Sequence, residues 1–188
     1  MASICVFCGS RSGDHPGYAQ AATELGKSLA GDGHRLIYGG GSTGIMGALA
    51  DAMLAHGGEI TGVIPSALAN VELMHADVQD MRIVPDMHVR KATMHSLADG
   101  YIALPGGFGT MEELFEVLCW AQLAFHTAPI AVLNTDGIYD GLLTMIRSMY
   151  DRGFIGDSCR NLLSVPNEMK QLRSWLNQHF GPATAPED

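Results

Sequence analysis

Short apolar runs alternate with longer amphipathic segments along most of the chain, and this alternation restricts the fold more than any other feature. The runs have the length of buried strands, and the longer segments carry apolar residues at helical spacings of three and four. We predict strands at 4–8, 36–38, 60–64, 101–104, 130–133 and 162–165, and helices at 18–30, 45–56, 87–98, 111–123, 139–152 and 168–180. Strands that alternate with helices need crossover connections, so the sheet is expected to be parallel and covered on both faces.

The polar stretch from 65 to 82 interrupts this pattern, and we predict no element there. There is no internal repeat, low-complexity region or interdomain linker. The prediction is a single α/β domain over residues 1–180, a doubly wound, Rossmann-like parallel sheet flanked by helices, followed by a flexible tail over 181–188. Ligands of such sheets bind outside the carboxyl ends of the strands.

Three glycine-rich loops fall at such strand ends: CGSRSG after the first strand, GGGSTGIMG after the second, and PGGFGT after the strand that ends at Leu104. Glycines allow backbone N–H groups to approach phosphate oxygens, and the following helix presents its positive end to the anion. Such glycines can also serve only tight turns and close packing of helix on sheet. Three loops at one edge favour a phosphate or nucleotide site, with Gly9, Ser10, Gly41 and Ser42 as candidate substrate contacts.

The second loop also satisfies the dinucleotide fingerprint G-x-G-x-x-G through Gly39, Gly41 and Gly44. In an NAD-binding fold the acidic residue about 20 positions further on stands at the carboxyl end of the next strand. Glu59 precedes the strand at 60–64 and therefore belongs to the opposite edge of the sheet. This placement argues against an NAD enzyme.

Arg90 occupies a position where a hydrophobic residue is expected. Met87, Arg90, Met94 and Leu97 recur at spacings of three and four, so they share one helix face that should point inward. A buried guanidinium requires an anionic partner. Two interpretations stay open: a salt bridge to a carboxylate on another helix, or a clamp on a phosphate or ribose-linked oxygen. The neighbouring Lys91 is either a solvated charge or a ligand contact.

Two carboxylates follow the third glycine loop directly. Thr110 and Glu113 fit the capping-box signature T-x-x-E, in which the two side chains satisfy backbone N–H groups at a helix start. The box does not explain why Glu112 and Glu116 crowd the same helix start, where they would repel a bound phosphate. If the loop holds phosphate, the carboxylates should face a part of the ligand that becomes positive.

Composition limits the partners. The formal net charge of −9 argues against a general grip on nucleic acid or an anionic membrane. No basic segment precedes the first apolar run, and no run approaches the roughly 20 apolar residues that cross a bilayer. We therefore expect a cytoplasmic protein.

The cysteines and histidines offer no pattern for a cofactor. Cys5 and Cys8 form a C-x-x-C, but on a strand they would point to opposite faces and pack as small hydrophobic residues. His88 and His95 lack a metal-ligand spacing. We expect no metal and no other cofactor.

Several of these motifs, in this order, resemble one known family. PGGFGTMEE fits the signature P-G-G-x-G-T-x-x-E, and DMHVRKATM resembles the M-H-x-R-K segment, of the LOG ("Lonely guy") family of cytokinin riboside 5'-monophosphate phosphoribohydrolases, a group often labelled possible lysine decarboxylases. The likeness continues through FCGSRSG, YGGGSTGIMG, WAQLAFHTAPI and NTDGIYDGLL, and so reaches to about residue 165.

The resemblance implies a homodimer, with active sites at or near the subunit interface, that hydrolyses the N-glycosidic bond of AMP and its N6-prenylated relatives to free base and ribose 5-phosphate. The family's catalytic Arg and Glu correspond to Arg90 and Glu113. Glu116 is a further candidate substrate contact beside these motifs. The family's nucleotide contacts correspond to Lys91, Gly106, Gly107, Gly109, Thr110 and Glu112.

Glycosidic cleavage passes through an oxocarbenium-like state, so a carboxylate near the sugar would help. We hypothesise that the third glycine loop, with the 39–47 loop, holds the 5'-phosphate and that Glu113 stabilises the ribosyl cation or activates water. Arg90 would orient the ribose phosphate and keep Glu113 ionised by pairing with it. The alternatives are a non-catalytic nucleotide-binding or carrier module and a pyridoxal-dependent lysine decarboxylase. The latter needs a Schiff-base lysine, and of three lysines only Lys91 is near the expected site.

Overall fold

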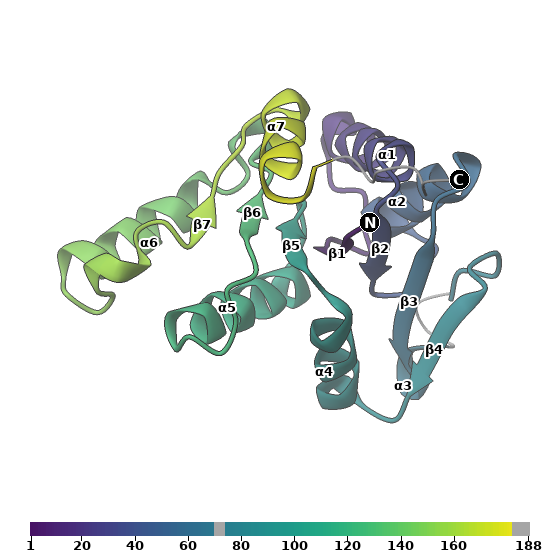
Figure 1. The fold of residues 1–188 in the computed structure, drawn as a ribbon, viewed down its shortest axis with the longest axis horizontal. Helices are drawn as coiled ribbons and strands as arrows, with labels where there is room; N and C mark the ends of the chain where they lie inside the picture. The colour runs from purple at the N-terminus through teal and green to yellow at the C-terminus, as the bar shows by residue number, and fades with distance from the viewer. Residues whose placement is uncertain (70–73, 182–188) are drawn as a thin grey trace.

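A seven-stranded parallel sheet forms the centre of the computed structural model, which describes residues 1–69 and 74–181 (Figure 1). The strands lie in the order β4-β3-β2-β1-β5-β6-β7, and every neighbouring pair is parallel. Their bounds are β1 (Ser3–Phe7), β2 (Arg35–Tyr38), β3 (Ile60–Pro65), β4 (Asp80–Val84), β5 (Gly100–Ala103), β6 (Ile130–Val132) and β7 (Leu163–Ser164). The predicted doubly wound, Rossmann-like α/β fold is confirmed.

Helices cover both faces of the sheet. In Figure 1 the first group, α1 (Pro16–Gly31), α2 (Gly44–Ala55) and α7 (Met169–Phe180), lies above the strands, and α4 (Met87–Leu97) and α5 (Phe108–Gln122) lie below them. The helix α6 (Asp140–Asp151) extends beside β7, and the chain adds the single turn α3 (Ser66–Ala69) and the 3-10 turns η1 (Thr135–Gly137) and η2 (Asp157–Cys159).

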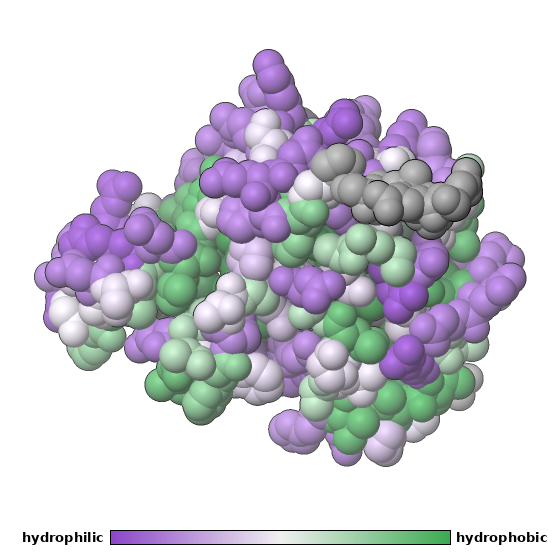
Figure 2. Space-filling model, in the orientation of Figure 1, coloured by the Kyte–Doolittle hydropathy of each residue, from purple (hydrophilic) through white to green (hydrophobic). Residues whose placement is uncertain are grey.

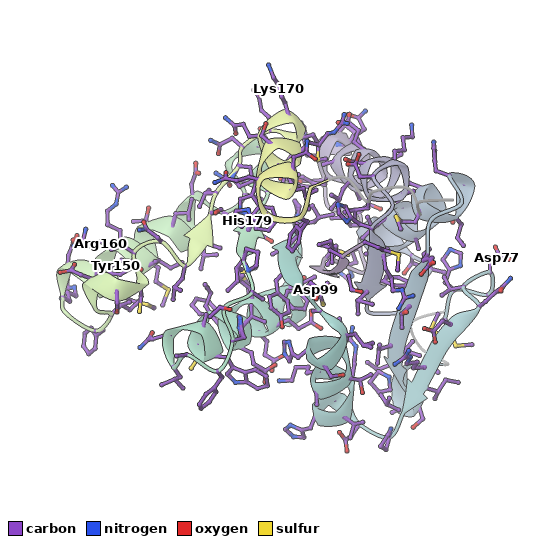
Figure 3. The ribbon with its side chains drawn as sticks, in the orientation of Figure 1. Asp77, Asp99, Tyr150, Arg160, Lys170 and His179 are labelled. Atoms are coloured by element: carbon purple, nitrogen blue, oxygen red, sulfur yellow. The ribbon has the colours of Figure 1, made fainter. Side chains whose placement is uncertain are left out.

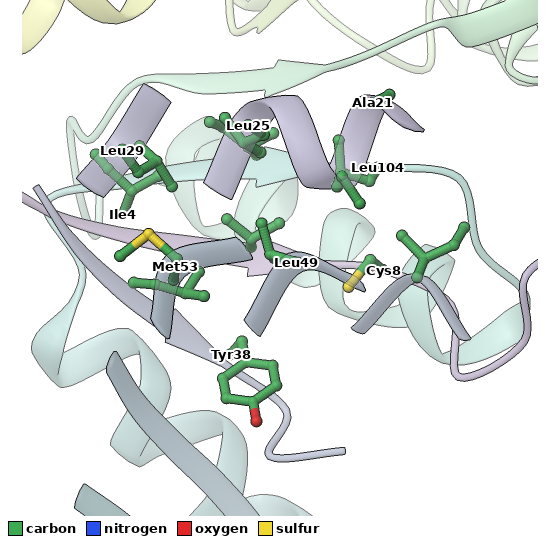
Figure 4. Close-up of a cluster of buried hydrophobic side chains, with 14 of the residues drawn as sticks. Ile4, Cys8, Ala21, Leu25, Leu29, Tyr38, Leu49, Met53 and Leu104 are labelled. Carbon is green, nitrogen blue, oxygen red and sulfur yellow. The ribbon is translucent and has the colours of Figure 1, made fainter. Parts of the chain in front are cut away.

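The alternation of side chains along β1 divides the core into two layers. Ile4 and Val6 point into the cluster shared with α1, α2 and α7, whereas Cys5 and Phe7 join the cluster under α4 and α5. Cys8 returns to the first cluster, so the two cysteines of the C-x-x-C lie on opposite faces as predicted. Figure 4 shows side chains of the first cluster, in which residues of α1 such as Leu25 and residues of α2 such as Leu49 meet Ile4 of β1. Both layers exclude water, and the central strand is buried on both sides.

The prediction that residues 65–82 hold no element is wrong at its two ends. The single turn α3 follows β3, and β4 begins at Asp80. Within residues 1–69 and 74–181, the strand β4 pairs with β3 alone, and its residues are exposed or partly buried, with Ile83 58% exposed. An edge strand can satisfy its backbone on one side without a continuous apolar run, which is why its sequence carries a weak signal.

Residues 70–73 and 182–188 lie outside the described part of the chain, and with them most of the tail that we predicted to be flexible. In residues 1–69 and 74–181, no helix combines the length and the apolar character that a membrane span needs.

The strand order creates a topological switch point. The chain moves outward from β1 through β2 and β3 to β4, then returns to place β5 on the other side of β1. The loops after β1 and β5 therefore lead to helices on opposite faces and separate at the carboxyl edge of the sheet. Ligands of doubly wound sheets bind in the crevice that forms at this point.

Candidate active site

A pocket of about 580 Å³ occupies the switch point. Its walls come from the loops after β1 and β5, the N-terminal parts of α1, α2 and α5, one side chain of α4 and the turn before α6. The lining residues are Cys8, Gly9, Ser10, Arg11, Gly13, Asp14, Tyr18, Ile45, Met46, Arg90, Pro105, Gly106, Gly107, Phe108, Gly109, Thr110, Glu113 and Ile138.

Backbone hydrogen bonds hold the three glycine loops together. The N–H of Gly9 donates to the carbonyl of Pro105 at 3.0 Å, and its carbonyl accepts from the N–H of Met46 at 3.1 Å. The hydroxyl of Thr43 donates to the carbonyl of Ser10 at 3.1 Å. The loop after β1 is thus fixed to both of its neighbours, and the pocket wall is built before any ligand arrives.

The helix α5 opens onto the pocket without a side-chain cap. Its N-cap residue is Gly107, so Thr110 lies inside the first turn and cannot act as the cap. The capping-box interpretation of Thr110 and Glu113 is therefore wrong: both side chains are buried in the helix and line the pocket. An extended glycine starts the helix one turn earlier than the sequence signature implied. The first N–H groups of α5 are left for a ligand, where the helix dipole favours an anion.

Arg90 and Glu113 form a buried ion pair on the floor of the pocket. Nη1 of Arg90 lies 3.2 Å from Oε1 of Glu113, and the side chains are only 10% and 8% exposed. Nε of Arg90 also donates to the carbonyl of Val63 at 3.1 Å. Oε1 of Glu113 accepts no hydrogen bond within the described residues, so the contact with Arg90 is an ion pair without hydrogen-bond geometry.

A glycine at the end of β2 makes room for this guanidinium. A Cβ atom on Gly39 would lie 2.2 Å from Nη2 of Arg90, closer than any tolerated contact. The predicted inward face of α4 is confirmed for Arg90 and Met94, which are 8% and 1% exposed, whereas Met87 is 38% exposed. Arg90 is therefore held on three sides, by Gly39 directly after β2, by β3 and by α5.

Burial raises the pKa of Glu113 to about 7, and the Arg90 guanidinium opposes this shift. Nearby charges act in both directions, since the Glu112 and Glu116 carboxylates raise the pKa of Glu113 and the Lys91 ammonium lowers it. Near neutral pH the buried carboxylate can therefore exchange a proton or remain ionised. Such a value is typical of carboxylates that act in catalysis.

Lys91, Glu112 and Glu116 lie outside the pocket lining and form a ladder of charges between α4 and α5, which we call the interhelical ladder. The ammonium of Lys91 pairs with Glu112 and, at 3.1 Å, with Glu116, whose other oxygen lies 3.1 Å from Nε2 of His95. Burial alone would lower the pKa of Lys91, but its hydrogen bonds to the two carboxylates raise it.

Helix geometry explains this division for Lys91 and Glu112. Successive residues of a helix point about 100° apart, because a turn takes about 3.6 residues. Arg90 and Glu113 meet at the floor of the pocket, so Lys91 and Glu112, their immediate neighbours in the chain, point to a different side of their helices.

The structure brings some predicted contacts together and leaves others apart. Eight predicted residues line the pocket: Gly9, Ser10, Arg90, Gly106, Gly107, Gly109, Thr110 and Glu113. Gly41 and Ser42 do not, and Gly41 instead forms an isolated bridge with Met74. The prediction that Glu59 lies at the amino edge is confirmed, since it precedes β3 and pairs with Arg35 at 2.6 Å.

Sequence reasoning missed the side chains that line the outer part of the pocket. Arg11, Asp14 and Tyr18 follow β1, and Ile138 precedes α6. Arg11 lies in the first glycine loop and Asp14 directly after it. Their position after the carboxyl end of a strand could have identified them as candidate ligand contacts. Among the residues that the structure describes, no group of three or more His, Cys, Asp or Glu side chains could hold a metal ion.

Comparisons with known proteins agree with this geometry. The family model described as "Possible lysine decarboxylase" matches residues 46–175. A probable cytokinin riboside 5'-monophosphate phosphoribohydrolase of Oryza sativa subsp. japonica is 47% identical over 171 residues, which cover 90% of this chain and 77% of the relative. A cytokinin riboside 5'-monophosphate phosphoribohydrolase of Arabidopsis thaliana is also 47% identical, over 90% of this chain and 79% of its own length.

Solved structures share the fold at much lower identity. The molybdenum cofactor carrier protein of Chlamydomonas reinhardtii superposes with a TM-score of 0.70 at 19% identity, over 94% of this chain and 96% of the carrier. That likeness concerns the fold alone. The family-model match, and relatives 47% identical over nine-tenths of the chain, place the chain in a family whose members carry phosphoribohydrolase names. The chain belongs to the LOG family of possible lysine decarboxylases.

Proposed function

We propose that this protein hydrolyses the N-glycosidic bond of AMP and of N6-prenylated riboside 5'-monophosphates, releasing the free base and ribose 5-phosphate. The observation that carries the proposal is the buried Arg90–Glu113 pair beneath the uncapped start of α5. Relatives at 47% identity named as cytokinin riboside 5'-monophosphate phosphoribohydrolases support the same activity.

The 5'-phosphate binds at the first turn of α5. Gly106, Gly107 and Gly109 leave the backbone open, and no side chain of the described residues caps the N–H groups of this turn. Thr110 adds a hydroxyl at the same place, and Gly9 and Ser10 close the site from the loop after β1. A phosphate here gains hydrogen bonds together with the favourable end of the helix dipole.

The ribose then extends toward Glu113, one turn further along α5. Cleavage between C1' and the base nitrogen places positive charge on the sugar. An ionised carboxylate either stabilises this charge directly or activates the water molecule that attacks the sugar. Arg90 holds Glu113 in place and favours its ionised form. Phosphate and carboxylate are thus kept apart by one turn of helix.

Lys91, Glu112 and Glu116 contribute through their effect on the pKa of Glu113, which the two carboxylates raise and the ammonium lowers. Their ion pairs join α4 to α5, the two helices that carry Arg90 and Glu113. Gly41 and Ser42 support the pocket from the loop after β2, whose first-turn neighbours Ile45 and Met46 reach the lining.

This arrangement also disfavours the decarboxylase chemistry that the family description mentions. A pyridoxal Schiff base forms from a neutral lysine amine. Lys91 is held as an ammonium between two carboxylates, with a raised pKa.

The assembly proposed is a homodimer in the cytoplasm, with α4 and α5 near the subunit interface. Exposed apolar side chains along these helices support it: Met87, Val89, Phe108, Phe115 and Leu123. Figure 2 shows green, hydrophobic residues at the C-terminal end of α5. The four cysteines are unpaired, as is usual in a reducing compartment. Light scattering of the pure protein should give about twice the 20.0 kDa chain mass, and a monomer at micromolar concentration would contradict the assembly.

The activity is tested by product analysis. The protein is incubated with AMP, isopentenyl-adenosine monophosphate, other nucleoside monophosphates or lysine, and the products are separated by chromatography. We expect free base and ribose 5-phosphate, and a loss of about 10²- to 10⁴-fold in Glu113→Gln, equivalent to about 3–5 kcal/mol of transition-state stabilisation. AMP that binds and is recovered intact would favour a carrier, and cadaverine from lysine would favour a decarboxylase.

A further inference from the structure

We propose that Arg11 is the residue that makes the pocket specific for a 5'-phosphate over the corresponding 5'-hydroxyl. This inference rests on the proposed function and names the side chain that recognises the anionic end of the substrate.

The pocket contains two cationic side chains, Arg90 and Arg11. Arg90 is committed to the protein itself, because its guanidinium pairs with Glu113, donates to Val63 and lies against Gly39. Lys91 lies outside the lining and is neutralised by Glu112 and Glu116. Neither is available to balance a phosphate dianion.

Arg11 is the cation that remains. It lines the pocket beside Ser10, and it forms no ion pair or side-chain hydrogen bond with any residue in 1–69 or 74–181. A guanidinium presents paired donors that match two phosphate oxygens, so it can take a phosphate in a bidentate arrangement. In a chain of net charge −9, a local cation is needed to attract a dianionic substrate.

The backbone of Arg11 is fixed even though its side chain is exposed. A Cβ atom on Gly44, whose φ is +64°, would lie 2.4 Å from the carbonyl carbon of Ser10 and 2.5 Å from the amide nitrogen of Arg11. The start of α2 therefore packs directly on the Ser10–Arg11 peptide, and the bond from Thr43 to Ser10 holds it there. This contact carries Arg11 on a rigid support at the same edge as the start of α5.

The pocket lining also includes one exposed carboxylate, that of Asp14. Its carboxylate lines the same cavity and would repel a phosphate, while it can accept hydrogen bonds from hydroxyl or amino groups. The phosphate is therefore expected to contact Arg11 and the first turn of α5, and not Asp14.

The test compares AMP with adenosine as substrates of the full-length protein. Arg11→Gln should lower kcat/KM for AMP about 10- to 100-fold, through KM, because a charge-assisted bond to phosphate is lost. The value for adenosine should stay within about twofold, since a 5'-hydroxyl makes no such bond, and Arg11→Lys should recover part of the loss for AMP. The control is Arg160→Gln, which removes another exposed arginine. Arg160 follows α6 and lies away from the strands in Figure 3, so this variant should change neither value.

Equal losses for AMP and adenosine in Arg11→Gln would overturn the proposal, and so would unchanged values for both. Calorimetric binding of AMP and adenosine to Glu113→Gln, with and without Arg11→Gln, gives a readout that does not need turnover. If the wild-type protein releases no base from AMP, the proposed function fails, and this binding comparison still decides the role of Arg11.

Discussion

The pKa of Glu113 predicts that the stability of the Glu113→Gln variant, relative to the wild type, increases as the pH rises. The carboxyl group has a reference pKa of 4.5 and a value of about 7 in the folded chain. A shift of this size, about 2.5 units, corresponds to about 3 kcal/mol of folding free energy. The group is buried, so solvent screens little of this cost.

The sign follows from proton binding. Below about pH 4.5 the carboxyl group is protonated in both the folded and the unfolded chain, and its contribution does not change with pH. Between about 4.5 and 7 the unfolded chain loses this proton while the folded chain keeps it, so the free energy of unfolding falls as pH rises. Glu113→Gln cannot ionise and escapes this fall.

Thermal unfolding at a series of pH values measures the effect. The Tm of Glu113→Gln minus that of the wild type should rise by about 6–12 °C between pH 4.5 and 8, given about 2–4 °C per kcal/mol for a domain of this size. Removal of the partner of Arg90 adds an offset, but this offset does not create the pH dependence. Glu24→Gln, at an exposed site on α1, serves as the control. A Tm difference that stays constant across this range would refute the reasoning.

Three further predictions concern the same site. Arg90→Met should leave the Glu113 carboxylate without its cation and raise its pKa further. Turnover at pH 7 should then fall about 10²- to 10⁴-fold while the circular dichroism spectrum stays unchanged, and near-wild-type release of adenine would contradict this prediction. Gly39→Ala should displace the guanidinium and lower kcat/KM about a hundredfold, whereas Gly31→Ala, where a Cβ meets nothing within 4 Å, should be silent in the same assay. Lys91→Met should move the acidic limb of the pH–rate profile to higher pH and Glu112→Gln to lower pH, because their charges act oppositely on that carboxylate; shifts in the same direction would exclude this coupling.

The spacing of apolar residues predicted the strands and helices whose sequences follow a regular pattern. The alternation of apolar runs gave the parallel sheet, and the spacing of three and four on α4 identified Arg90 as an inward-facing cation. It could not identify the partner, because Glu113 lies on another helix and the distance between them depends on how both pack on the sheet. The salt bridge to a helix carboxylate, one of the two interpretations left open, is present.

Short sequence motifs were less informative than the spacing of apolar residues, because one motif can be compatible with two different local structures. T-x-x-E describes a capping box only if the helix begins at Thr110, and the extended backbone of Gly107 starts it earlier. Residues that are neighbours in the sequence were likewise expected in the same site, although successive residues of a helix point in different directions. Lys91 follows Arg90 in the chain, yet it points to the interhelical ladder and not to the pocket.

The strand order has a consequence for synthesis of the chain. β1 lies at the middle of the sheet, yet its partner β5 begins to pair 96 residues later, where Ile4 meets Gly100. At a translation rate of about 5–20 residues per second, roughly 5–20 s separate the two strands on the ribosome. During that interval the nascent sheet can grow only toward β4, and the apolar segment SICVF stands at an open edge that invites pairing with another chain. Ribosome-bound chains that stop before residue 100 are therefore expected to aggregate or to recruit chaperones more than chains that include β5.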